Sequence, residues 1–401
     1  MIFFVSGRRF LVECYTQVLD WRLLFKLRFT MEMDQDVAKR LFEEGATLII
    51  LNVPVGTEFG IDMKTWNTGE KFMGIKMIPP GIHSVYYSPT NKHGDVAPRV
   101  SFMQNFGRSE FVVKKWDVDA EGVSNDVVSA EDVKKLKDNV QSLDQFLGAY
   151  PYDTYEAWKK LSEHITPLLL TKLTPECGLI RSALDLVCTS KKTPPAKRTG
   201  RSRTFEQKEE ELLPELTPLP GTGIRFSPFP ENGYPPGSTP QEITKHSLDQ
   251  SYTLDLMIDK SESAISLVGE LQFTFICFFL GHSLEALEAW RSMVQLFCKC
   301  RNALVKRKDV YLQFLRALES QLNHIPEDFL VDIVASNNVI YASLRELFQS
   351  ISEISEVDGR FKCLAERMQH RLTEKFGWDF ENLDLEDGED APVIVDLGPI
   401  S

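Results

Sequence analysis

The spacing of hydrophobic and polar positions changes near residue 125, and this change divides the chain into two kinds of structure. Before it, short apolar runs such as residues 48–51 and 85–87 are bounded by glycine, proline and asparagine, as is typical of buried β-strands. After it, apolar residues recur every three or four positions, which indicates amphipathic helices. The pattern predicts an α+β, multidomain fold in which a β-sandwich-like domain at residues 34–128 is followed by helices.

Stiff turns separate the predicted strands. Pro79, Pro80 and Gly81 fix two φ angles and then permit a positive one, so we expect a rigid bend there. Two further apolar runs, 100–104 and 110–116, flank a short loop that contains a glycine. This arrangement predicts a β-hairpin.

Residues 129–187 predict a helical connector. Ser129 begins a sequence typical of a capping box, and an apolar stripe follows it through Leu147. The stripe covers only two heptads, which favours packing onto the sandwich over a long coiled coil. Further helices are expected at 155–170 and 176–187. The residues of the stripe are Val133, Leu136, Val140, Leu143 and Leu147.

Residues 188–240 have a different composition, dominated by proline, glycine, serine, threonine and charge. Such a segment lacks the apolar residues needed for a core, so it predicts a disordered linker. Its basic cluster at 191–203 is compatible with nuclear localisation or phosphate binding, and equally typical of a solvated linker. We expect residues 223–227 to dock locally.

Residues 241–378 predict an α-helical domain of about seven helices with short loops, which indicates antiparallel neighbours stacked as a superhelix. The run 271–280 is apolar on nearly all sides but is too short to span a bilayer, so it predicts the central helix. No repeat of fixed period is visible. Four of the expected buried stripes are Ala286, Trp290, Met293 and Phe297; Tyr311, Leu315, Leu318 and Leu322; Ile340, Leu344, Leu347, Ile351 and Ile354; and Phe361, Leu364, Met368 and Leu372.

Residues 1–33 mix aromatic and basic side chains. Their apolar runs are too interrupted for a signal-peptide core or a membrane span. A targeting segment is one interpretation; we favour a non-conforming N-terminal extension, with translation starting at Met31 or Met33.

The net charge of −13 argues against a non-specific grip on nucleic acid, which needs a basic surface, and favours a protein partner with a basic face. Seven scattered cysteines indicate a reducing compartment. Cys298 and Cys300 have the spacing of half a metal site, but no second pair completes it, so ordinary helix residues are expected.

The sequence does not predict an enzyme, a cofactor or a metal. It contains no nucleophile elbow, phosphate-binding P-loop, dinucleotide glycine pattern or HExxH motif. Residues 56–60 (GTEFG) have glycines but no phosphate-binding lysine. His83 is the most suggestive histidine, and a hydrogen-bonded loop histidine is a better interpretation than a catalytic base.

Seven phrases carry a family resemblance, in this order: AKRLFEEGA, GTEFGID, KMIPPGIH, LDQFLGAYPY, EITKHSLD, GELQF and KFGWDF. Together they resemble the AAR-two splicing-factor family, whose members are chaperones of U5 small nuclear ribonucleoprotein (snRNP) assembly. The resemblance implies a VHS-like helical domain and binding to the large U5 scaffold protein. It implies contact with that protein's RNase H-like and Jab/MPN-like domains before the U5 helicase joins. We expect the chain in cytoplasm and nucleus.

Residues 379–401 combine an acidic spacer with an apolar end. The resemblance implies that this end adds a strand to sheet edges of the partner, and the alternation of side chains suits β-augmentation. Pro392 cannot donate a hydrogen bond, so pairing should begin at the next residue. A disordered end and a strand folded onto the chain's own sandwich are the alternatives. The expected partner-binding residues are Pro392, Val393, Ile394, Val395, Asp396 and Leu397.

A second functional hypothesis is a VHS-like membrane-trafficking adaptor that recognises cargo peptides. No lipidation motif or basic amphipathic helix supports it, and we expect neither membrane association nor sequence-specific nucleic-acid binding.

Overall fold

The computed structural model describes residues 41–380 except 42, 91–94, 125, 185, 189–215, 328 and 330–337. The predicted N-terminal extension and the expected partner-binding residues 392–397 therefore lie outside the described residues, as does the basic cluster at 191–203.

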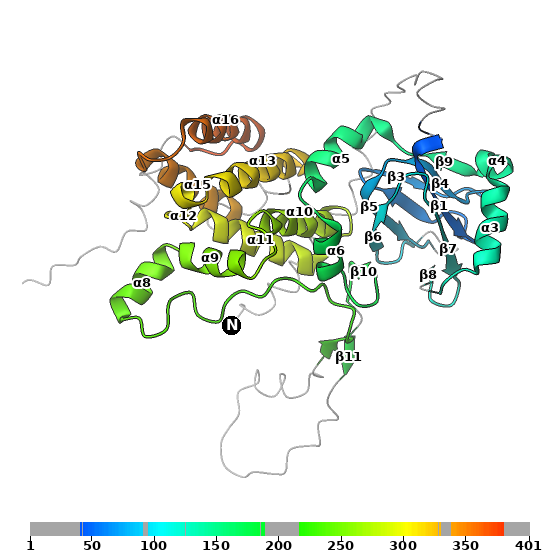
Figure 1. The fold of residues 1–401 in the computed structure, drawn as a ribbon, viewed down its shortest axis with the longest axis horizontal. Helices are drawn as coiled ribbons and strands as arrows, with labels where there is room; N and C mark the ends of the chain where they lie inside the picture. The colour runs from blue at the N-terminus through cyan, green and yellow to red at the C-terminus, as the bar shows by residue number, and fades with distance from the viewer. Residues whose placement is uncertain are drawn as a thin grey trace, which may run out of the picture. The chain divides into compact units, whose positions relative to one another are not determined.

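The described chain forms two compact units (Figure 1). The first is built around β-sheets and the second is helical, so the predicted α+β, multidomain organisation is confirmed. The VHS-like superhelix stays a prediction. The first unit draws its residues from 1–159, 170–225 and 276–285, and the second from 160–169, 226–275 and 286–401.

Two five-stranded sheets form the first unit. One has the strand order β8-β7-β1-β4-β9 and the other β10-β6-β5-β2-β3. A separate pair joins β11 (Leu186–Cys188) to β12 (Leu216–Pro218). The remaining strands are β1 (Ala46–Leu51), β2 (Glu58–Ile61), β3 (Lys64–Asn67), β4 (Gly74–Ile78), β5 (Gly81–Ser88), β6 (Val100–Phe106), β7 (Phe111–Asp117), β8 (Gly122–Val123), β9 (Leu147–Ala149) and β10 (Ile180–Arg181).

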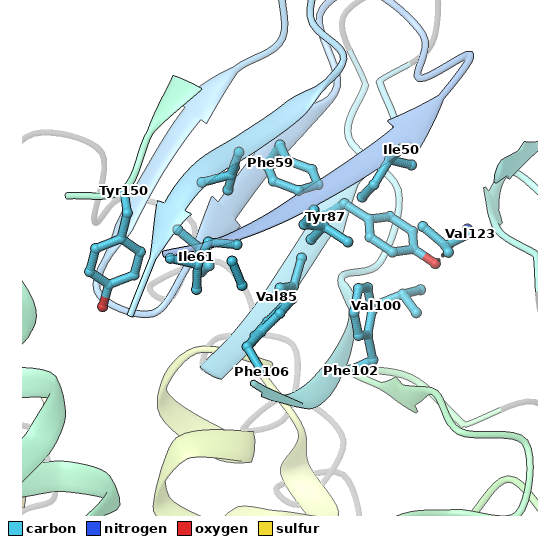
Figure 2. Close-up of a cluster of buried hydrophobic side chains, with 14 of the residues drawn as sticks. Ile50, Phe59, Ile61, Val85, Tyr87, Val100, Phe102, Phe106, Val123 and Tyr150 are labelled. Atoms are coloured by element: carbon cyan, nitrogen blue, oxygen red, sulfur yellow. Dashed lines mark hydrogen bonds between the residues drawn. The ribbon is translucent and has the colours of Figure 1, made fainter. Parts of the chain in front are cut away.

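One apolar core is shared by residues of both five-stranded sheets, as expected of a sandwich (Figure 2). Ile50 comes from one sheet and Phe59 from the other, and both are fully buried. The rings of Tyr87 and Trp116, again from opposite sheets, meet edge to face with centroids 5.0 Å apart. The Tyr87 hydroxyl also accepts a hydrogen bond of 2.8 Å from the Val123 backbone. This buried hydrogen bond therefore connects β5 of one sheet with β8 of the other.

The Pro79-Pro80-Gly81 bend joins β4 of one sheet to β5 of the other, so it is a corner between layers. Gly81 has φ +135°, which only glycine adopts easily. The predicted rigid turn is confirmed.

The predicted hairpin between 100–104 and 110–116 is wrong. β6 and β7 lie in different sheets, because β6 is already flanked by β5 and β10. β7 instead pairs in parallel with β1, in the register Thr47 with Phe111. The loop between β6 and β7 crosses the layers, and Ser109 adopts φ +50° there.

The predicted connector is helical only in part. Its first helix, α3 (Ala130–Asp138), ends at Asn139, whose side-chain amide donates to the Lys135 carbonyl and occupies that acceptor. A short α4 (Val140–Leu143) follows, and Leu147 belongs to β9. The stripe of residues 133–147 is therefore not one helix. The expected helix at 176–187 is also wrong, because that segment supplies β10 and β11.

Part of the predicted linker is folded. The Arg225 backbone donates to the Leu173 carbonyl over 2.9 Å, and its guanidinium donates to the carbonyls of Thr171 and Thr174. These acceptors lie at the end of α6 (Pro167–Leu173), where helical carbonyls lack partners within the helix. Local docking of 223–227 is confirmed, and a disordered linker is wrong for residues 216–240.

The helical unit buries its predicted stripes except at Ile354, which caps the end of α15 and is only partly buried. α10 is central as expected, and its polar residues are paired: Glu270 accepts from the Ser227 backbone, and Gln272 accepts from the backbone of His164. The helices of this unit, with α5 before them, are α5 (Tyr155–Ser162), α8 (Pro240–Leu248), α9 (Ser251–Asp259), α10 (Ser266–Phe279), α11 (Leu284–Cys298), α12 (Ala303–Lys306), α13 (Lys308–His324), α15 (Val339–Glu353) and α16 (Gly359–Phe376).

Candidate functional site

His83 lies in β5 and not in a loop, and it is buried. Its Nδ1 is 2.6 Å from Oδ2 of Asp62, and its Nε2 is 2.8 Å from the Pro79 carbonyl oxygen. A carbonyl oxygen only accepts hydrogen bonds, so Nε2 donates. The interpretation of a hydrogen-bonded histidine is confirmed, although its predicted place in a loop is wrong.

Asp62 is the centre of this cluster. Its carboxylate accepts hydrogen bonds from the Tyr150 hydroxyl at 2.6 Å and from the Ser84 backbone at 2.9 Å, in addition to its contact with His83. Burial, followed by the charge of Asp62, raises the pKa of Tyr150, so its hydroxyl stays protonated.

The cluster is closed by aromatic rings. Trp158 stacks on His83 with centroids 6.1 Å apart, and its indole donates to the Ile82 carbonyl. The rings of Tyr150 and His83 meet edge to face, with centroids 5.3 Å apart. These side chains are all buried, and their hydrogen bonds connect β5 with the residues that follow β2 and β9. The cluster resembles a catalytic Asp–His pair in composition, and its burial favours a structural role.

The glycines of residues 56–60 have structural explanations. Gly56 adopts φ +82° in the turn before β2. Gly60 lies in β2 against the ring of Tyr86, and an added Cβ would stand 2.3 Å from the ring carbons. These positions support a close strand packing and not a phosphate-binding loop.

Cys298 and Cys300 belong to no group of side chains that could bind a metal ion within the described residues. Cys298 and Cys300 are buried, and burial raises the pKa of both thiols. The Cys300 thiol donates to the Leu296 carbonyl. Over the described residues, no group of three or more His, Cys, Asp or Glu side chains could hold a metal ion. In the same part of the chain, no helix is long and apolar enough to cross a membrane.

A second polar cluster in the first unit surrounds Arg99 and is partly buried. Its guanidinium pairs with Glu58, lies 4.7 Å from the ring centroid of Tyr86, and donates to the Leu280 carbonyl over 2.8 Å. It also approaches Nε2 of His282 at 3.1 Å. Burial and then the charge of Arg99 lower the pKa of His282 from 6.5 to about 3, so its ring is neutral and Nε2 accepts.

The helical unit contains a groove of about 610 Å³. α8 contributes Lys245 and Leu248, the turn after α11 contributes Lys299 and Arg301, and α15 contributes Glu346. The groove is open to solvent and is lined by both apolar and charged side chains. Its composition suits an extended peptide better than a small organic molecule, because long charged side chains line it without an enclosing apolar wall.

Comparison with known proteins identifies the family. A model described as the AAR2 N-terminal domain matches residues 44–175, and one described as the AAR2 C-terminal repeat region matches residues 226–381. The chain belongs to the AAR2 family. It is 40% identical over 378 residues to Protein AAR2 homolog of Homo sapiens, covering 92% of this chain and 97% of that protein.

Other members of the AAR2 family give the same result over nearly their whole length. Protein AAR2 homolog of Mus musculus is 39% identical over 92% of this chain and 98% of the relative. That of Caenorhabditis elegans is 31% identical over 86% of this chain and 97% of the relative. The resemblance to the AAR-two splicing-factor family is confirmed.

Two features of this AAR2 family member were not expected from its sequence. The partnership of Asp62 with His83 and Tyr150 joins three separate segments, and Arg99 contacts residues far along the chain. Neither set of contacts could be predicted from neighbouring residues, because the partners are far apart in the sequence and follow no helix or strand period. The expected partner-binding residues 392–397 lie outside the described part of the chain, so their role stays a prediction.

Proposed function

We propose that this chain is a pre-mRNA splicing factor that acts as an assembly chaperone of the U5 snRNP. It binds the large U5 scaffold protein and holds off the U5 helicase until maturation. The observation that carries the proposal is the match to both AAR2 domain models, together with 40% identity to the human relative over 92% of the chain. The proposed activity is binding, without a catalytic step or a cofactor.

The proposed partner surfaces are the RNase H-like and Jab/MPN-like domains of the scaffold. Residues 392–397 add a strand to sheet edges of these domains, with main-chain hydrogen bonds supplying affinity and alternate side chains setting the register. The net charge of −13 supports a partner with a basic face, since complementary charge speeds encounter and excludes acidic competitors.

The proposed chaperone works in the cytoplasm and the nucleus. Affinity purification from separate cytoplasmic and nuclear extracts tests this, with the bound proteins identified by mass spectrometry. We expect the U5 scaffold protein to be captured without the U5 helicase. Capture of cargo receptors or membranes in place of the scaffold would favour the trafficking adaptor and reject the chaperone.

A further inference from the structure

Three basic side chains line the groove of the helical unit. Within the described residues, Lys245 and Lys299 form no ion pair, and both line the groove. Arg301 also lines it and pairs with Glu353 at 2.5 Å. Beside them Leu248 is 74% exposed and offers an apolar contact at the edge of the groove.

Asp249 and Glu346 also line the groove, but the first accepts hydrogen bonds and the second has a raised pKa. Both oxygens of Asp249 accept backbone hydrogen bonds, from Ser251 at 3.0 Å and from Asn302 at 3.1 Å. Burial raises the pKa of Glu346, and the charge of Lys299 offsets this only in part. The groove therefore favours an acidic ligand with apolar side chains, even though the whole chain carries −13.

The described chain ends on the helix that borders this groove. Phe380 is buried against α15, with its ring edge-on to Phe348 at 5.1 Å. The Tyr341 hydroxyl donates to the Asp379 carbonyl over 2.7 Å, and Arg345 reaches the same oxygen. Arg345 and the groove residue Gln349 are four positions apart, so they lie on one stripe of α15.

The residues that follow Phe380 have the chemistry that the groove favours. Residues 381–390 read ENLDLEDGED, which contains two leucines and six acids. The five residues from Glu381 to Leu385 reach about 17 Å when extended, which exceeds the width of a helix. The segment is therefore long enough to pass from Phe348 across α15 to the groove.

We propose that residues 381–390 dock in the groove of their own chain. Leu383 or Leu385 packs on Leu248, and neighbouring carboxylates pair with Lys245 and Lys299. The covalent link at Phe380 keeps the segment at a high effective concentration, so weak contacts suffice to fill the groove. This occupancy draws the expected partner-binding tail toward the helical unit. Docking requires no scaffold protein, so it stands or fails independently of the proposed chaperone function.

Zero-length carbodiimide cross-linking of the full chain tests the proposal. The reagent joins a lysine amine to a carboxylate in contact with it, and peptide mass spectrometry locates the bond. We expect cross-links from Lys245 or Lys299 to acids of 381–390, and their loss in 1 M salt, where the screening length falls to about 3 Å. Lys306 and Asp255, which are 2.6 Å apart, supply an internal positive control.

The occupant is identified by mixing chains of normal and heavy nitrogen. Cross-links confined to one isotope support docking within a chain, whereas mixed-isotope products identify a second copy as the occupant and overturn the proposal. Absence of groove cross-links while Lys306 and Asp255 react also overturns it.

A protease specific for glutamate supplies a second measurement. In the full-length chain, Lys245→Glu with Lys299→Glu should speed cleavage within 381–390 at least fivefold, because the segment is released. Lys308→Glu is the matched control, since Lys308 is a nearby exposed cation outside the groove, and cleavage should not change. Equal rates in all three proteins would contradict docking.

Discussion

Arg99 donates a hydrogen bond of 2.8 Å to the carbonyl of Leu280, although the two residues are 181 positions apart in the sequence. The same guanidinium pairs with Glu58 and faces His282. Arg99, which directly precedes β6, thus holds the end of α10 and the start of α11, residues 276–285, within the first unit. Burial, and then the charge of Arg99, lower the pKa of His282 and keep its ring neutral, so the stability of this contact depends on pH.

His282 makes the stability of the protein fall in acid. Its pKa is lowered to about 3 in the folded chain and is 6.5 when unperturbed. Between these values the unfolded chain binds the proton and the folded chain does not, so stability is present above pH 6.5 and is lost as the pH falls. From pH 7 to pH 5 the loss is about 2 kcal/mol at 1.36 kcal/mol per pH unit.

Urea titrations at pH 7 and pH 5 measure this loss. The variant His282→Asn, which tolerates the positive φ of this position, should lose less stability between the two pH values than the native chain. His370→Asn is the control, because His370 is exposed and should leave the pH dependence as it is. An unchanged pH dependence in His282→Asn would refute the assignment.

Tyr150→Phe should destabilise the chain by about 1–3 kcal/mol, because it removes one donor from the buried carboxylate of Asp62. Tyr155→Phe is a matched change on a half-buried ring nearby, and we expect an effect below about 0.5 kcal/mol. The free energy of unfolding in urea measures both. Equal effects of the two substitutions would show that the Tyr150 hydroxyl contributes nothing specific.

Trypsin should cut the native chain first within residues 191–203. Arg225 is exposed, yet its backbone and guanidinium hydrogen bonds to the end of α6 should protect the following bond. Mass analysis of the earliest fragments distinguishes the sites. Early cleavage after Arg225 would contradict the folded state of residues 216–240.

The parts of the fold that sequence could predict are those set by local periodicity. Residues such as Trp290 and Leu344 recur at helical spacing with their neighbours, and the structure buries them. The Pro79-Pro80-Gly81 bend was predictable because φ restriction acts within three residues. Strand pairing in sheets is not local. β7 pairs with β1 and lies in a different sheet from β6, and no feature of residues 100–116 predicts this pairing.

The candidate site was predictable only as residue types. The sequence singled out His83 by its residue type. Asp62 and Tyr150, which follow β2 and β9, lie beside it only in the folded chain. Burial of the cluster then decided between a structural and a catalytic histidine. The groove around Lys299 likewise depends on how α8 and α15 lie beside the end of α11, which sequence spacing does not give.

The tail prediction can be tested by one substitution. Val395→Pro removes a backbone donor in the middle of the proposed added strand, so it should weaken binding of an isolated scaffold domain at least tenfold. Ser401→Pro is a matched control beyond the proposed strand and should bind normally. Isothermal titration with each purified domain gives the affinities, and equal affinities for both variants would exclude main-chain pairing at this position.

The most direct test of the chaperone proposal mixes the chain with the separately purified RNase H-like and Jab/MPN-like domains of the U5 scaffold protein, and measures complex mass by analytical ultracentrifugation. The full chain should join both domains in one ternary complex, and deletion of residues 391–401 should abolish that complex while the helical and β units stay folded. If the full chain binds neither domain, the proposed function is wrong.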